Sequence, residues 1–427
     1  MHSGTISEKI LSRAAGRPLR AGDLAICHPD FAMGTDGSVP MALDYLAQMQ
    51  PVTASLAHPQ RLLFALDHYG PASGTQAQAL QARVREYAHR HGVRLLEVGN
   101  GIGHQVVLES GSARPGLLLV GADSHAVSYG AVNAFATGIG SSDLAGFMLC
   151  GQVWLKVPQT LQVNLRGRLQ PGVSAKDVAL FLAGTLGADG AAYQVLEFCG
   201  PGVAALDMDD RIVLANMSVE VGAKAGIFPF DEVTDRWLRD RLGGDFEGVG
   251  PDANATYCGR IDLDLDAVVP QLALPHRVDN VVDLTAAPRT RIDLVYLGTC
   301  TGGRVKDYRE ALDVLRQGGG IAPGVQVVVT PASAQVGAHL QSSGMLDEFA
   351  AMGALIQPPG CGSCCGTCGM VPADGANVLS TANRNFRGRM GNGKSAIFLA
   401  SPRACAAAAT TGWIGGAPAP TRAELGP

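Results

Sequence analysis

The chain has 427 residues, with 33 Lys and Arg against 38 Asp and Glu, a formal net charge of −5. This length is enough for two or three domains with buried cores, at about 100–200 residues each. The acidic balance and the lack of a basic block argue against nucleic-acid or anionic-membrane binding. No apolar run approaches the ~18 residues of a membrane span. The 55 glycines and 5% aromatic residues favour an α/β enzyme over a β-sandwich.

The N-terminal segment lacks the apolar core of a signal peptide, so we expect a cytoplasmic protein. Thr5 and Glu8 have the spacing of a capping box, which predicts a short helix that begins here. Apolar residues at helical spacing predict a second helix over residues 76–91.

Two apolar runs end in glycine-rich turns that lead into amphipathic segments. Residues 117–120 precede the Gly-Ala-Asp-Ser-His turn at 121–125, and residues 292–297 precede Gly-Thr-Cys-Thr-Gly-Gly, with helical spacing over 305–315. Strand, glycine turn and helix form the unit of a parallel α/β sheet, and its turns lie at the carboxyl edge where ligands bind. Shifts in composition predict three α/β domains, which span residues 1–157, 158–287 and 288–427.

Five of the ten cysteines lie between residues 300 and 368, and this clustering favours metal or cluster ligation. Cys361 and Cys364 form a CxxC motif, which zinc sites, disulfide exchange and iron–sulfur clusters all use. Because Cys300 lies in a separate turn, three thiolates from two loops suit a cluster that leaves one iron open to substrate. Cys365 and Cys368 leave a zinc site as the alternative. The other five cysteines are interpreted as small buried hydrophobes.

Six segments resemble signature blocks of the aconitase superfamily, in the family's order along nearly the whole chain. They are TISEKILSRAAG (5–16), GADSHAVSYGAVNAFATGIGSSD (121–143), EFCGPGVAALDMDDRIVLANMSVEVGAKAGIFPFD (197–231), YLGTCTGGRVKDYREA (296–311), PPGCGSC (358–364) and STANRNFRGRMG (380–391). The resemblance is greatest to the separate large subunits of the 3-isopropylmalate dehydratase and homoaconitase type. It implies three α/β domains with parallel and mixed sheets, packed around an iron–sulfur cluster.

The resemblance implies a hydro-lyase that isomerises a 2-hydroxy di- or tricarboxylic acid by dehydration and rehydration, with 3-isopropylmalate dehydratase as the first expectation. Homoaconitase, dimethylmalate or citramalate hydratase and a substituted-malate isomerase of a specialised pathway are the alternatives. The implied cofactor is one [4Fe–4S] cluster per chain, held by Cys300, Cys361 and Cys364, with one iron open to substrate. Asn216 and Thr301 would contact this cofactor.

The same resemblance implies roles for acid–base and substrate-binding side chains. The implied catalytic residues are Asp67, His68, His104, Asp123, His125 and Glu220. The implied substrate-binding residues are Ser124, Asn383, Arg384 and Arg389. A histidine beside carboxylates can be tuned toward either protonation state, as proton delivery to a hydroxyl group requires. Guanidinium groups bind carboxylates through paired hydrogen bonds.

Some positions depart from the family pattern and leave the substrate open. They are Thr35, Pro40, Ala126, Gly302 and Cys365. The chain ends shortly after residue 416, without room for the swivelling fourth domain of single-chain aconitases, so we expect a separate small subunit in a heterodimer or heterotetramer. The expected ligand is a small hydroxy acid, with no membrane partner. A non-catalytic zinc-binding or RNA-binding relative is the remote alternative, and the net charge argues against RNA.

Overall fold

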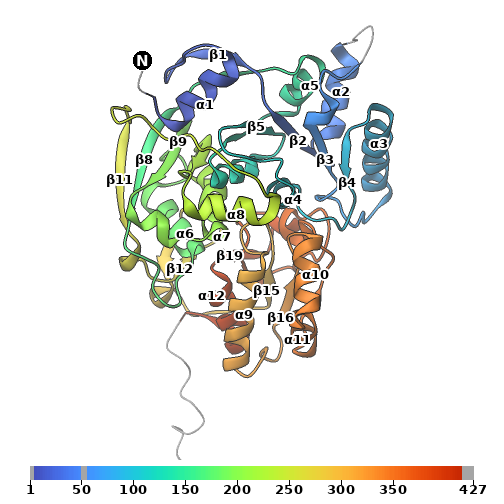
Figure 1. Cartoon of the computed structure of the whole chain (residues 1–427). Helices are drawn as coiled ribbons and strands as arrows, with labels where there is room; N and C mark the ends of the chain where they lie inside the picture. The colour runs from blue at the N-terminus through green and yellow to red at the C-terminus, as the bar shows by residue number, and fades with distance from the viewer. Residues whose placement is uncertain (1–3, 50–54, 416–427) are drawn as a thin grey trace, which may run out of the picture.

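Three α/β lobes make up the structure, a computed structural model that describes residues 4–49 and 55–415 (Figure 1). Each lobe is built on its own sheet, and the three sheets take their strands from residues 31–138, 159–264 and 271–399 in turn. The predicted α/β class is confirmed. Two strands that precede residue 287 belong to the third sheet, and the division at residues 157/158 and 287/288 stays a prediction.

The first lobe has a five-stranded parallel sheet in the order β4-β3-β2-β5-β6. The chain moves outward from β2 to β4 and then returns to β5, so the direction of winding reverses between β2 and β5. Ligands bind beyond the carboxyl ends of the strands at such a reversal. The elements are β2 (Phe31–Thr35), α2 (Val39–Met49), η1 (Pro59–Arg61), β3 (Leu62–Ala65), α3 (Thr75–His91), β4 (Arg94–Leu96), α4 (Gly103–Glu109), β5 (Leu118–Gly121), η2 (Ser124–Val132), β6 (Phe135–Gly138) and α5 (Ser141–Cys150).

The second lobe has a four-stranded parallel sheet in the order β10-β9-β8-β11. Its helix α7 lies against η2 of the first lobe and is buried almost along its whole length. The elements are β8 (Gln159–Arg166), α6 (Ala175–Leu186), β9 (Gln194–Cys199), η3 (Pro201–Ala205), α7 (Met208–Met217), η4 (Ser218–Val221), β10 (Ala225–Ile227), α8 (Glu232–Leu242), β11 (Gly259–Asp264) and η5 (Leu265–Ala267).

The third lobe has a mixed seven-stranded sheet in the order β13-β12-β19-β18-β15-β16-β17, in which β12 runs antiparallel to both of its neighbours. The winding reverses between β15 and β18, so this sheet also offers a ligand site at its carboxyl edge. The elements are β12 (Gln271–Ala273), β13 (Val281–Asp283), η6 (Leu284–Ala286), β15 (Leu294–Leu297), α9 (Val305–Gln317), β16 (Gln326–Val329), α10 (Ala334–Ser342), α11 (Met345–Ala351), β17 (Leu355–Ile356), η7 (Gly362–Cys365), β18 (Asn377–Ser380), η8 (Arg389–Gly391), β19 (Ala396–Leu399) and α12 (Pro402–Thr411).

The predicted helices are present. Helix α1 (Ile6–Ala15) begins with the capping box, since the Thr5 hydroxyl accepts from the Glu8 amide and Glu8 accepts from the Thr5 amide. Helix α3 starts one residue before the predicted helix, and α9 covers the helical spacing found after residue 304. No helix in residues 4–49 and 55–415 is long and apolar enough to span a membrane.

Two small antiparallel pairs complete the fold, β1 (Leu24–Cys27) with β7 (Val153–Lys156) and β14 (Thr290–Arg291) with β20 (Trp413–Ile414). The first and third lobes meet at Gly101, which forms a bridge with Ser333. Gly101 has φ +119°, and a Cβ atom there would lie 2.4 Å from the Ser333 Cα. Only glycine allows this close approach without a shift of backbone. One hydrophobic cluster also spans all three sheets, through side chains such as Met33, Val163 and Val328.

Candidate active site

The carboxyl edges of the first and third sheets lie against each other, and the functional side chains follow their strands. Strand β3 leads to Asp67 and His68, and β15 leads to Cys300. The two edges are joined directly, because the Cys361 amide donates to the Asp67 carbonyl at 3.3 Å. Acid–base side chains from one lobe and cysteines from another therefore share one site.

Asp123 is the centre of the acid–base side chains. Its carboxylate lies 2.8 Å from His104 Nε2 and 3.3 Å from His68 Nε2, and it accepts from the His125 amide at 2.8 Å. Burial alone would raise the pKa of Asp123, but the charge and hydrogen bonds of these histidines hold it well below the usual range. The second His104 nitrogen meets the buried Tyr129 hydroxyl at 3.0 Å. Asp123 is therefore ionised, and three histidines are oriented around it.

His68 lies between two carboxylates and a cysteine. Its Nδ1 is 2.8 Å from Asp67 and 4.0 Å from the Cys361 sulfur. Burial lowers the pKa of His68, but the charges of Cys361, Asp67 and Asp123 outweigh it and raise the pKa well above its usual value. The backbone is fixed as well, since the buried Asp36 carboxylate accepts from the His68 amide at 3.0 Å. The raised pKa of His68 favours the protonated imidazole when Cys361 is a thiolate, and the ring links the acid–base side chains to the cysteines.

A second acid–base pair forms between the first two lobes. His125 Nε2 lies 2.9 Å from Glu220, and Arg384 Nε donates to the same carboxylate at 2.9 and 3.0 Å. Burial would raise the pKa of Glu220, but the hydrogen bond from His125 and the Arg384 charge lower it. Since both His125 and Glu220 are buried, this pair can hold a proton at a defined position.

The sulfurs of Cys300 and Cys364 accept polar hydrogens, as cluster thiolates do. The Cys300 sulfur accepts from the amides of Asn216 and Asn383, each at 3.2 Å. The Cys364 sulfur accepts from Arg389 Nη2 at 3.2 Å. Burial and then the charge of Cys364 raise the pKa of the Cys300 thiol to about 11. The Cys300 and Cys361 thiols therefore favour their neutral form until a metal supplies the compensating charge.

The spacing of the donor atoms disfavours a zinc ion held by three or more cysteines. In the described part of the chain, the three donors within 4.8 Å of one another belong to Asp67, His68 and Cys361, and no such trio consists of cysteines. A tetrahedral zinc ion, with Zn–S bonds of about 2.3 Å, needs its thiolates close together. Cys365 and Cys368 hydrogen-bond to each other and to backbone, with sulfurs 3.4 Å from the His68 carbonyl and 3.1 Å from the Gly362 carbonyl. The four-cysteine zinc alternative is disfavoured because, in the part of the chain that the structure describes, no three cysteine sulfurs lie within 4.8 Å of one another.

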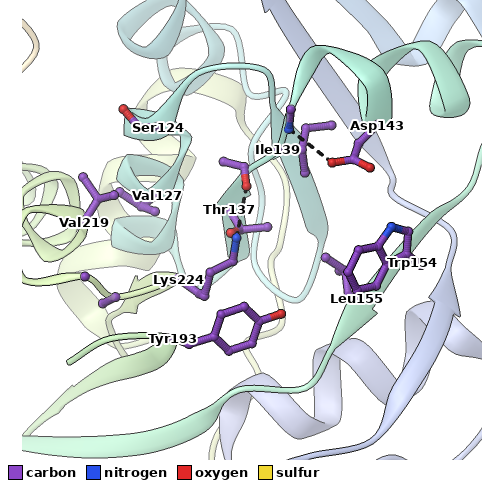
Figure 2. A pocket seen from close by; sticks show the side chains of 14 residues that line it. Ser124, Val127, Thr137, Ile139, Asp143, Trp154, Leu155, Tyr193, Val219 and Lys224 are labelled. Atoms are coloured by element: carbon purple, nitrogen blue, oxygen red, sulfur yellow. Dashed lines mark hydrogen bonds between the residues drawn. The ribbon is translucent and has the colours of Figure 1, made fainter. Parts of the chain in front are cut away.

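Two predicted site residues lie away from this network. The Thr301 hydroxyl donates to the Thr381 carbonyl at 2.8 Å, so it braces the loop and does not point at a sulfur. Ser124 lies on a separate cavity of about 440 Å³ between the first two lobes, whose far side includes Trp154, Tyr193 and Lys224 (Figure 2). All other predicted site residues lie in the network of Asp123, the histidines and the cysteines, or donate to it.

Sequence reasoning missed several residues that hold the site. Tyr129, Lys176 and Arg304 are buried and bond to site residues or to the loops that carry them. Arg304 donates to the Cys300 carbonyl at 2.7 Å and to Gln105, beside His104, at 3.1 Å. No spacing pattern marks these residues, because each acts through a backbone oxygen or a distant side chain.

The departure at Gly302 has a physical reason. A Cβ atom at Gly302 would lie 2.4 Å from the Thr381 Cβ, so a larger residue would collide with the loop that carries Asn383. Two of the other departures lie at or just after the carboxyl end of β2. Thr35 is buried at the end of β2, and Pro40 lies in the first turn of α2.

The chain matches the family model described as the aconitase family (aconitate hydratase) over residues 8–291 and 285–412. It is 41% identical over 412 residues to the homoaconitase large subunit of Thermus thermophilus, with 96% of each chain covered. It is 41% identical over 414 residues to 3-isopropylmalate dehydratase large subunit 1 of Thermotoga maritima, with 96% of this chain and 98% of that protein covered. It is also similar in fold to the holo-form of Thermococcus kodakaraensis aconitase X, with a TM-score of 0.51, 13% identity and 84% of each chain covered.

Proposed function

Because this chain belongs to the aconitase family and is a hydro-lyase, we propose that it is the large subunit of a 3-isopropylmalate dehydratase. The reaction moves a hydroxyl group to the neighbouring carbon by dehydration and rehydration. One observation carries this proposal: His68 lies 4.0 Å from the Cys361 sulfur and 3.3 Å from Asp123, so proton-transfer groups and metal-binding thiols share one site.

The family implies an iron–sulfur cluster, and we propose a [4Fe–4S] cluster held by Cys300, Cys361 and Cys364. When bound, such a cluster supplies an iron that acts as a Lewis acid on the substrate hydroxyl group. Asn216 and Asn383 hold the Cys300 sulfur through two hydrogen bonds, which also offset thiolate charge.

The protein's own acid–base groups manage the protons. The His125–Glu220 pair holds a proton on the hydrogen bond between Nε2 and the carboxylate, where it can be passed to a departing hydroxyl group. His68, whose pKa is raised by Cys361, Asp67 and Asp123, is a second donor. His104 and Asp123 keep the His68 ring oriented.

Arginine side chains account for the acidic substrate class. Arg384 is fixed by Glu220 through Nε, and the outer Nη edge of its guanidinium group is proposed to take one substrate carboxylate. Arg389, fixed by the Cys364 sulfur, is proposed to take another. Asn383 and Ser124 are proposed to add polar contacts.

A small subunit is proposed to complete the enzyme, in a heterodimer or heterotetramer, since the relatives above are named large subunits. A homoaconitase is the second candidate, because relatives with that name and with the dehydratase name are equally similar at 41%.

We place the protein in the cytoplasm, where free thiols persist, since all ten cysteines are unpaired.

Measurement of iron, acid-labile sulfide and zinc in the chain purified without oxygen tests the proposal. Iron and sulfide in near-equal amounts support it, and zinc without sulfide overturns the cluster.

The chain is then combined with its co-expressed small subunit and assayed with isopropylmalate, homocitrate, citramalate and dimethylmalate. Ultraviolet absorbance of the unsaturated acid reports turnover. Preference for homocitrate would replace the dehydratase by the homoaconitase, and no turnover with any of the four would overturn both.

A further inference from the structure

A buried lysine joins the two loops that carry the cysteine site. Lys176 lies in the first turn of α6 and is 1% exposed. Its Nζ donates to the carbonyls of Thr381 at 2.9 Å and Ala382 at 2.5 Å, and to the Thr301 hydroxyl at 3.2 Å. All three ammonium hydrogens are thus used, and none of the three acceptors is a carboxylate.

The negative charges that act on this ammonium come mainly from cysteines. Burial lowers the pKa of Lys176 to about 8, and the groups that counter this effect are, in order, Cys300, Cys405, Cys364 and Glu220. Among the described residues, Lys176 has no ion pair with a carboxylate within 4.0 Å. Since an unpaired buried ammonium is costly, it needs a negative partner elsewhere.

The acceptors of Lys176 adjoin the groups that hold the sulfurs. Thr301 follows Cys300 directly, and Ala382 precedes Asn383. The Asn383 side chain contacts both sulfurs, with Nδ2 3.2 Å from Cys300 and Oδ1 4.0 Å from Cys364. A shift of the lysine would therefore move both loops.

We propose that Lys176 is the counter-charge and positioning residue of the cysteine site: its ammonium offsets the charge of the thiolates and fixes the loops of Cys300 and Asn383. The proposal rests on the proposed function only in that the cysteines bind a metal as thiolates. Residues behind metal ligands typically change metal affinity about 10–100-fold when they are altered.

The test compares Lys176→Gln, which removes the charge, with Lys176→Arg, which keeps it. Lys224→Gln is the matched control, since Lys224 is partly buried and donates to a backbone carbonyl away from the cysteines. The readouts are the rate of iron loss to a chelator and the reduction potential of the cluster. We expect about tenfold or faster iron loss and a more negative potential for the Gln variant, both restored toward wild type by Arg. A Gln variant with wild-type values of both would overturn the proposal.

A Cys300→Ser background separates this role from a structural one. If Lys176 balances cluster charge, Lys176→Gln should lower the free energy of unfolding in the loaded protein and leave it equal or higher in the Cys300→Ser background. The proposal would be overturned if Lys176→Gln destabilised the loaded protein and the Cys300→Ser background equally, or if it prevented folding in both. If the wild type holds another metal, the proposed function fails, and the release rate of that metal still tests Lys176.

Discussion

The acid–base half and the cysteine half of the site differ in how complete they are. In the acid–base half, Asp123, Glu220 and their histidines satisfy one another at 2.8–3.3 Å, and the pKa values of both carboxyl groups are lowered. In the cysteine half, burial raises the pKa values of Cys300 and Cys361. The first half is thus organised by its own charges, whereas the second needs metal to become charged.

This difference indicates that the two halves fail in different ways. Loss of a cysteine should remove the metal, whereas loss of an acid–base residue should leave the metal in place and stop proton transfer. The hydrogen bond from Arg389 to Cys364 is the point at which a substrate-binding residue also touches the cysteine half.

The largest effect is expected for Cys300→Ser. A serine hydroxyl is a poor ligand for iron, and the two amide hydrogens of Asn216 and Asn383 would lose their thiolate acceptor. We expect loss of most iron and sulfide, and loss of measurable turnover with the small subunit. Cys27→Ala is the control, because that thiol is buried on β1 and should leave iron content unchanged. Retained iron would exclude Cys300 as a ligand.

His125→Ala should reduce kcat about 100-fold to 10,000-fold with iron retained, which is the usual range for loss of a general acid or base. The reason is that Glu220 would keep its Arg384 contact but lose the group with which it shares a proton. Steady-state kinetics and the cluster spectrum measure the two effects. Turnover near wild type would remove His125 from proton transfer.

The two arginines should separate binding from cluster effects. Arg384→Lys and Arg389→Lys should each lower kcat/KM about tenfold to a hundredfold, since a charge-assisted hydrogen bond is worth about 1.5–3 kcal/mol. Only Arg389→Lys should also change the cluster spectrum, because only Arg389 donates to a cysteine sulfur. An unchanged spectrum in both variants would mean that this hydrogen bond does not persist in the loaded protein.

Gly302→Asn should lower the free energy of unfolding by about 1–3 kcal/mol, the usual cost of overpacking a buried position. The added side chain would meet Thr381. Thermal unfolding measures the effect. A stable Gly302→Asn variant with normal iron content would show that the loop can move.

The smallest effect is a pH dependence of stability. Because the pKa of Glu220 is lowered on folding, its ionised form stabilises the protein above the ordinary carboxyl pKa of about 4, and this contribution is lost as pH falls through the lowered value. The difference in unfolding free energy between wild type and Glu220→Gln should therefore shrink on acidification. A constant difference from neutral to acid pH would contradict the sign of the shift.

Local sequence determined those features that depend on neighbouring residues. Thr5 and Glu8 specify the start of α1, because both partners of the capping box lie within one turn. The glycine turns after β5 and β15 identified the segments of Asp123 and Cys300, since a parallel sheet presents such turns at one edge. The α/β class and the family were therefore available from the chain alone.

Tertiary structure decided which of these turns meet and what holds them. The contact of His68 with Cys361 joins residues 293 positions apart, and Lys176 reaches Ala382 across 206 positions. Ser124, inside a motif, faces a separate cavity, and Lys176, outside any motif, lies behind the cysteines. Such long-range hydrogen bonds depend on how the three sheets pack, and the spacing of residues along the chain does not reveal that packing.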